Sequence, residues 1–255
     1  MKLTQWILRM LKTTILILAI GGAASACSSM SWKEEVLLHD GKKIVVERFY
    51  NLGGYPALDS RDRAALDETV TFKPHPTGKE IIWRTDFRDS VPEPNSLNLL
   101  LLDVVKDVPY IATYPVGCIA YNKWKRPNPT YIFFKYENEE WKQIPLAEFP
   151  AELTRANVII GRPATSSLKS FYTVKGVDDE NYDIHTPEYK TILREPMPKA
   201  GAYCPEMVTN GHGDWFSMDT FKGHPSYGAC LQFCKRNSFT EQNCLCESNL
   251  INKGK

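Results

Sequence analysis

Short runs in which apolar and polar residues alternate fill the region after residue 31, and turn-forming residues separate them. A period of two residues is typical of strands that bury one face. Four such runs predict two antiparallel hairpins: 34–39 with 42–48, and 68–73 with 80–86. Asp40-Gly41, between the first two runs, is a favoured dipeptide of a type I′ turn, and it supports the first hairpin.

The middle of the chain contains more continuous apolar segments. Residues 97–102 predict a strand that is covered on both faces, with a buried helix as the alternative, because leucine also favours helices. Pro145 lies late in a predicted strand, which places that strand at the edge of a sheet. The remaining predictions are strands at 109–114, 131–136, 141–146, 158–160 and 189–194, and a short helix at 146–153.

This pattern predicts a mainly β protein with few short helices. An antiparallel sandwich, a barrel or a curved sheet fits best, and a β-propeller is a weaker alternative because no long repeat is present. We place a β-rich body at 32–198 and a small disulfide-stapled tail at 199–255, where five of the cysteines fall. A segment as short as the tail rarely buries enough apolar surface to fold without covalent links.

The first residues carry an export signal. Lys2, Arg9 and Lys12 precede an apolar stretch that is too short for a comfortable membrane span, and small residues lead to Cys27. We therefore predict a signal peptide at 1–26. Ala24-Ser-Ala-Cys27 resembles the lipobox of bacterial lipoproteins, and an ordinary A-x-A cleavage site is the alternative. The resemblance implies lipid attachment to Cys27, with 27–31 as anchor and short tether.

The cysteine count agrees with lipid attachment. The chain has seven cysteines, and six remain when Cys27 is set aside. An even number in an exported protein suits a disulfide framework, whereas a seventh would leave a reactive thiol. Cys118 is the doubtful member, because a single cysteine in an apolar segment is often simply buried. The disulfide candidates are Cys118, Cys204, Cys230, Cys234, Cys244 and Cys246.

Charge gives little indication of a partner. The whole chain has a formal charge of +1, which becomes −2 when the three basic residues of the signal are removed. This balance does not favour nucleic acid or an electrostatic attraction to anionic lipid. Membrane lipid bound through acylated Cys27 is therefore the partner that we expect, with a protein or an envelope glycan as the further candidate.

Several short patterns suggest chemistry, but none is specific. Ser166 and Lys169 match the S-x-x-K of penicillin-binding enzymes, without a following K-T-G strand. Residues 178–183 offer oxygen ligands for calcium, but the EF-hand positions for glycine and glutamate are wrong. His212 and His224 lie near tail cysteines, where zinc or C-x-C redox chemistry competes with disulfides. We predict no catalytic residue, cofactor or metal.

One segment is a more specific candidate for binding. Residues 121–129 combine three cations with aromatic rings and end in Pro-Asn-Pro, which indicates a turn. Such a patch can stack on sugar rings or bind an anionic polymer. A loop that joins two strands, with its tryptophan folded inward, is the alternative. The residues of this candidate patch are Tyr121, Lys123, Trp124, Lys125 and Arg126.

Three segments carry a family resemblance: 32–48, 120–129 with 133–136, and 189–196. They resemble a group of uncharacterised proteobacterial exported proteins and lipoproteins, over roughly 32–196. The resemblance implies no activity and no functional residue. By resemblance to enterobacterial lipoproteins, Ser28 in place of aspartate implies sorting to the outer membrane. We therefore expect a non-catalytic binding module at the periplasmic face of the outer membrane, with an envelope hydrolase as the alternative.

Overall fold

The computed structural model describes residues 28–54, 62–88 and 96–246. The predicted signal peptide 1–26, the predicted lipid-attachment residue Cys27 and the end of the tail lie outside these residues. The strands are β1 Ser28–Leu37, β2 Lys43–Gly53, β3 Ala64–Phe72, β4 Ile81–Asp86, β5 Leu97–Val105, β6 Val108–Pro115, β7 Ile132–Glu137, β8 Glu140–Ile144, β9 Phe171–Tyr172, β10 Met207–Thr209 and β11 Trp215–Ser217. The helices are α2 Gly117–Lys123, α3 Val174–Glu180, α4 Pro187–Lys190, α5 Met218–Lys222 and α6 Tyr227–Arg236, with 3-10 turns η1 Leu146–Glu148 and η2 Thr165–Ser167.

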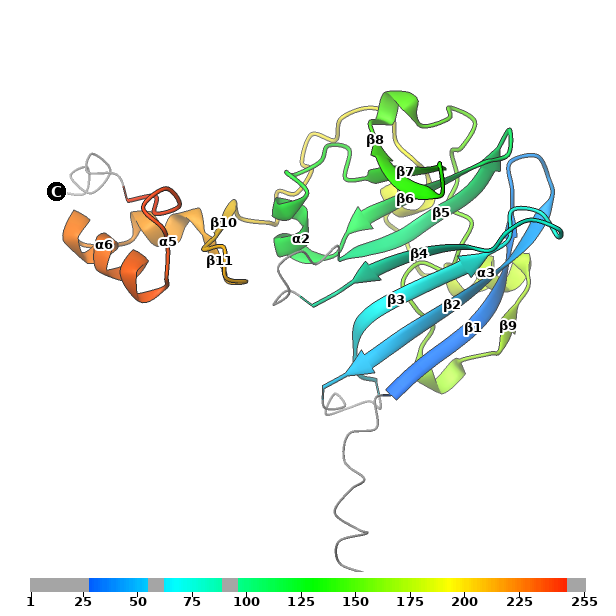
Figure 1. Cartoon of the computed structure of the whole chain (residues 1–255), viewed down its shortest axis with the longest axis horizontal. Helices are drawn as coiled ribbons and strands as arrows, with labels where there is room; N and C mark the ends of the chain where they lie inside the picture. The colour runs from blue at the N-terminus through cyan, green and yellow to red at the C-terminus, as the bar shows by residue number, and fades with distance from the viewer. Residues whose placement is uncertain (1–27, 55–61, 89–95, 247–255) are drawn as a thin grey trace, which may run out of the picture.

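Two sheets form the body, as Figure 1 shows. The first has the order β4-β3-β2-β1-β9, and the second has the order β5-β6-β7-β8. All neighbouring strands in them are antiparallel except β1 and β9, which pair in parallel. The fold class is thus confirmed as mainly β, with few short helices, and the strands of the described residues do not close into a barrel.

The first predicted hairpin is confirmed, but the predicted type I′ turn is wrong. Leu38 N–H donates to Lys42 O at 2.8 Å, and Gly41 N–H donates to Leu38 O at 3.0 Å. A type I′ turn needs positive φ at both central residues, whereas here Gly41 alone is left-handed, at φ 84°. The connection is therefore a type I turn closed by a left-handed glycine, the usual longer hairpin loop.

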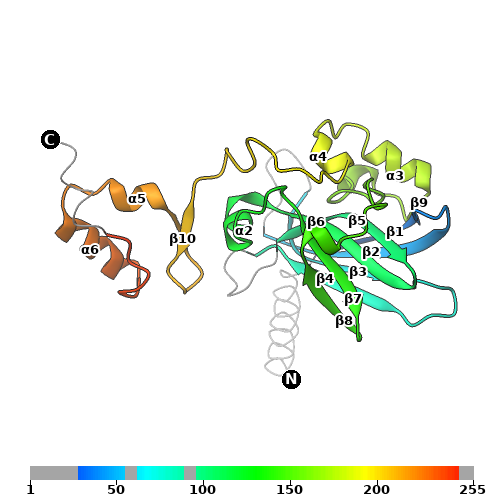
Figure 2. The same cartoon turned by 90° about the horizontal axis from the view of Figure 1, so that it is seen from above.

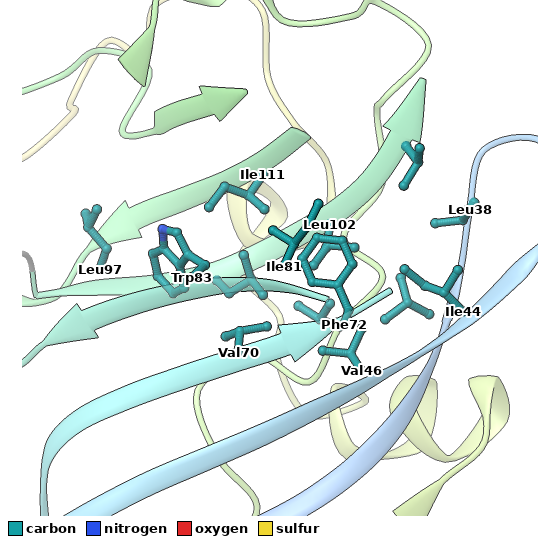
Figure 3. Packing of buried hydrophobic residues seen from close by; sticks show 14 of the residues in the cluster. Leu38, Ile44, Val46, Val70, Phe72, Ile81, Trp83, Leu97, Leu102 and Ile111 are labelled. Atoms are coloured by element: carbon teal, nitrogen blue, oxygen red, sulfur yellow. The ribbon is translucent and has the colours of Figure 1, made fainter. Parts of the chain in front are cut away.

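The main core lies between the two sheets. Val36, Val46 and Val70 of the first sheet are fully buried and meet Leu99 and Leu102 of the second. Figure 3 shows the side chains that fill this space. Strand β5 is buried along nearly its whole length, so the prediction of a strand covered on both faces is confirmed and the buried helix is excluded.

Two predicted strands are wrong. Residues 158–160 are largely buried but lie outside every strand, and 189–194 begins inside helix α4 and continues as a loop with one isolated bridge, between Arg155 and Thr191. The helix predicted at 146–153 is only the 3-10 turn η1. This non-strand chain covers the outer face of the second sheet, where Phe149, Leu153 and Ile192 pack on it.

The tail forms a small unit of its own. Figures 1 and 2 show β10, β11, α5 and α6 beyond α2, apart from the two sheets. Its core contains Phe221, Cys230 and Cys234, all nearly inaccessible, with partly buried phenylalanines around them. Its first element, β10, begins at Met207.

At the other end, residues 28–31 are the first part of β1 rather than a tether, and Ser28 already pairs with Leu52. In the described parts of the chain, no helix is long and apolar enough to cross a membrane.

Candidate functional site

The aromatic and basic segment joins the body to the tail. Tyr121 lies in α2, not in a turn, and it is buried. The guanidinium of Arg126 lies 5.0 Å from the centre of the Tyr121 ring, and it donates to the carbonyl oxygens of Gly201, Cys204 and Pro205. These contacts hold the start of the tail against α2.

The other residues of this segment are divided between core and surface. The Trp124 ring packs edge-on against Phe134, with 6.2 Å between the ring centres. Lys123 ends α2 and is partly buried, whereas Lys125 is exposed. The segment therefore does not present a flat aromatic and basic face.

All six cysteines after Cys27 are paired. Cys118, the doubtful member, is bonded to Cys204 across 86 residues of sequence. In the tail, Cys230 is bonded to Cys246 and Cys234 to Cys244. The sulfurs of Cys230, Cys234 and Cys246 lie within 4.8 Å of one another, close enough for one metal ion, but the disulfides leave them no thiolate to offer.

The S-x-x-K and calcium patterns form no site. Ser166 is exposed in η2, and the Lys169 ammonium lies 5.3 Å above the Tyr172 ring. The acidic stretch begins in the last turn of α3, and two of its carboxylates pair with cations: Asp178 with Arg155 at 3.0 Å and Asp179 with Lys175 at 2.7 Å.

The tail histidines have separate surroundings. His212 N–H donates to Asn210 Oδ1 in a tight loop. The His224 ring packs against Phe233, with 4.9 Å between the ring centres, and its buried Nε2 has no hydrogen-bond partner among the described residues. Neither histidine is joined to a cysteine by a hydrogen bond in the described structure.

A pair that the sequence analysis missed lines a cavity of about 300 Å³ in the body. His39 Nδ1 lies 2.7 Å from Asp103 Oδ1, and His39 N–H donates to Asp103 Oδ2 at 2.8 Å. The Asp103 side chain is 4% exposed and the His39 side chain 27% exposed. The carboxylate thus fixes both the main chain and the imidazole of His39 at the mouth of the cavity.

A β-bulge directs Asp103 to this cavity. Leu97 and Leu99 face the main core, and strict alternation would also turn residues 101 and 103 inward. The register shifts between Leu99 and Leu101, so Leu102 and Val104 face the core instead. Leu101 and Asp103 therefore point to the other side, where both line the cavity. Re-aiming a side chain beside a site is a common use of a bulge.

The hydrogen bond also fixes the histidine tautomer. The Asp103 oxygen at Nδ1 already accepts from Val104 N–H, and an ionised carboxylate only accepts, so Nδ1 must carry the proton. This leaves the lone pair of the neutral imidazole on Nε2, the arrangement found in histidines that act as bases. In the part of the chain that the structure describes, no residue forms a hydrogen bond with His39 Nε2.

The rest of the cavity is apolar with a charged rim. Asn157 closes its floor: its amide group donates to Leu37 O and Leu102 O, and its oxygen accepts from Leu102 N–H. These hydrogen bonds join the end of β1 to β5. Apolar walls with a few polar groups are typical of ligand sites. The charged lining residues are Asp103, Glu152, Arg155 and Asp178.

A second polar cluster is fully enclosed. Arg48 lies between Glu34 and Glu68, and all three side chains are 0% exposed. Arg48 also donates to the carbonyl oxygens of Ile159 and Gly161, at 3.0 and 3.2 Å. Burial raises the pKa of Glu68 above its ordinary range although Arg48 opposes this. Because none of the three side chains has exposed surface, the ion pairs join the strands inside the fold.

Comparisons give no relative for this fold or site. No family model matches the chain, no curated protein matches it, and no solved structure matches it.

Proposed function

We propose that this chain is an exported lipoprotein, anchored through Cys27 at the periplasmic face of the outer membrane, that binds an envelope ligand without changing it. The observation that carries the anchor is the pairing of all six later cysteines, which leaves Cys27 as the single unpaired cysteine. Disulfides form in oxidising compartments, and lipid on Cys27 accounts for the odd number. Acyl chains on one residue give stable anchoring.

The binding role is supported by the cavity beside His39. A pocket of about 300 Å³ with apolar walls and one fixed imidazole matches small-molecule sites in size and lining. Within the described residues, no serine, threonine or cysteine forms a hydrogen bond with His39 Nε2. A covalent catalytic triad therefore has no nucleophile here.

The anchor is tested by replacing the acylated residue. We expect Cys27→Ser to abolish metabolic palmitate labelling and to release the protein from the membrane fraction. Ser28→Ala, a change of similar size at the next residue, is the control and should leave labelling unchanged. Normal labelling and fractionation of Cys27→Ser would overturn the proposal.

Hydrolysis is the second candidate, and the Asp103-oriented His39 favours it. A base in this tautomer can take a proton from water as the water attacks a bound ester or amide. The test is turnover of small esters and amides by the purified protein. Activity that His39→Gln abolishes and His75→Gln leaves intact would favour the hydrolase, and no turnover would remove it.

A further inference from the structure

The cavity offers acceptors and little positive charge. With His39 neutral, its lining carries three carboxylates against one guanidinium. That guanidinium, on Arg155, is already paired with Asp178 at 3.0 Å. Like charges repel and opposite charges attract most strongly where water is partly excluded, so the lining favours a cation over an anion.

The imidazole adds a directional preference. In neutral His39, the Asp103 carboxylate holds the proton on Nδ1, so Nε2 accepts a hydrogen bond and does not donate one. Neutral His39 cannot attract an anion, and its lone pair needs an O–H or N–H from the ligand. The apolar walls, which include Leu101, Leu153 and Val177, suit a compact carbon skeleton.

We propose that this cavity binds a small hydroxylated organic ammonium of the amino-sugar kind, with one of its O–H or N–H groups donating to His39 Nε2. The cationic group lies against the acidic rim, and the ring lies on the apolar walls. The proposal names the ligand for the binding function given above and rests on that function. It is measured independently of the membrane anchor.

The test titrates the oxidised full chain with glucosamine and with glucose. The two sugars differ only in the 2-amino group, which is cationic in glucosamine. Calorimetry should give an affinity for glucosamine about tenfold above that for glucose, as expected for one charge near two uncompensated carboxylates. Long-range ¹H–¹⁵N spectra should place the His39 proton on Nδ1, and glucosamine should shift the Nε2 resonance.

Two variants test the rim charges and the Asp103–His39 pair. Glu152→Gln with Asp178→Asn removes the rim charges at exposed positions, and the affinity for glucosamine should fall to that for glucose. Asp103→Asn removes one lining carboxylate and supplies an amide that donates to Nδ1, which moves the proton to Nε2. Together these two changes should weaken glucosamine binding about tenfold. His75→Gln is the control: this histidine pairs with Asp107 at 3.0 Å on the exposed surface.

Three results would overturn the proposal: equal affinity for the two sugars, no binding of either sugar, or resonance shifts that map away from the cavity. The rim variant keeps the test valid should Asp103→Asn fail to fold. A failed titration with normal palmitate labelling would remove this ligand and leave the anchor in place. If the titration and the palmitate labelling both failed, the proposed function would be overturned as well.

Discussion

Replacing Arg48 by methionine tests whether the buried charge cluster holds the body together. The guanidinium is 0% exposed and makes ion pairs with both Glu34 and Glu68. It also supplies hydrogen bonds to the carbonyl oxygens of Ile159 and Gly161. Methionine is similar in length and apolar, so Arg48→Met removes the charge and the donors while keeping most of the volume.

The expected loss of stability follows from the groups that Arg48→Met leaves without a partner. Two carboxylates would share an enclosed space without a cation, and removal of one partner from a buried ion pair destabilises by about 3–5 kcal/mol. Ile159 O loses its donor, which adds up to about 1–3 kcal/mol, partly within the same figure, whereas Gly161 O still accepts from the Tyr50 hydroxyl at 3.0 Å. A domain is stable by about 5–15 kcal/mol, so we expect a marginal or partly unfolded body.

The assay is urea denaturation of the oxidised protein, followed by tryptophan fluorescence. Trp32 is a direct reporter because its ring stacks on Tyr50, with 5.6 Å between the centres, and lies under the Arg48 guanidinium. Arg84→Met is the matched control, since Arg84 is exposed on β4 and its loss should change stability by less than about 0.5 kcal/mol. A loss below about 1 kcal/mol for Arg48→Met would refute the reasoning.

Two further substitutions follow from the same packing. Burial raises the folded-state pKa of Glu68, so its contribution to stability is fully present below the unfolded pKa of about 4.3 and is lost as pH rises through the folded pKa. Glu68→Gln should therefore flatten the fall of Tm as the pH rises above about 4.3, and an unchanged slope would contradict the assignment. Gly201 has φ +62°, and a Cβ there would lie 2.0 Å from the Tyr121 ring. Gly201→Ala should speed proteolysis between body and tail, whereas Gly211→Ala, at φ +80° in open space, should not.

The alternation along the chain predicted the hairpins because each strand of the first sheet buries one face. The same alternation places the buried charges on the core-facing side of these strands. Counting by two from Val36, Val46 and Val70 reaches Glu34, Arg48 and Glu68. Their burial depends on three strands aligning in space, which no single run of residues reveals.

Residues 158–160 misled the prediction for a different reason. They are apolar and largely buried, but their backbone groups bind side chains rather than a neighbouring strand. Ile159 N–H donates to Glu34 Oε2, and Ile160 N–H donates to Asn181 Oδ1. These partners are distant in sequence. The start of α4 could have been predicted, because proline after a threonine, as in Thr186-Pro187, is a common beginning of a helix.

The cavity could not be predicted from the sequence, because its lining depends on one bulge. Asp103 at the end of an apolar run was a signal, since an aspartate there needs partners. The run of four consecutive leucines does not show which leucine is the extra residue of the bulge. The sequence therefore does not show to which side of the sheet Asp103 points. Its partner His39 is 64 residues away, in a hairpin turn that is typical of surface loops.

The proposed anchor residue directly precedes β1, and the cavity lies beyond the other end of that strand. With lipid on Cys27, the next residue already belongs to β1, so the body has no flexible spacer of its own from the bilayer. The 10 residues of β1 extend about 33 Å before the chain reaches His39. Acyl chains cannot cover that distance, so the cavity is not a site for the protein's own lipid. A water-soluble or polymer-borne ligand is what such a position requires, and a hydroxylated ammonium meets that requirement.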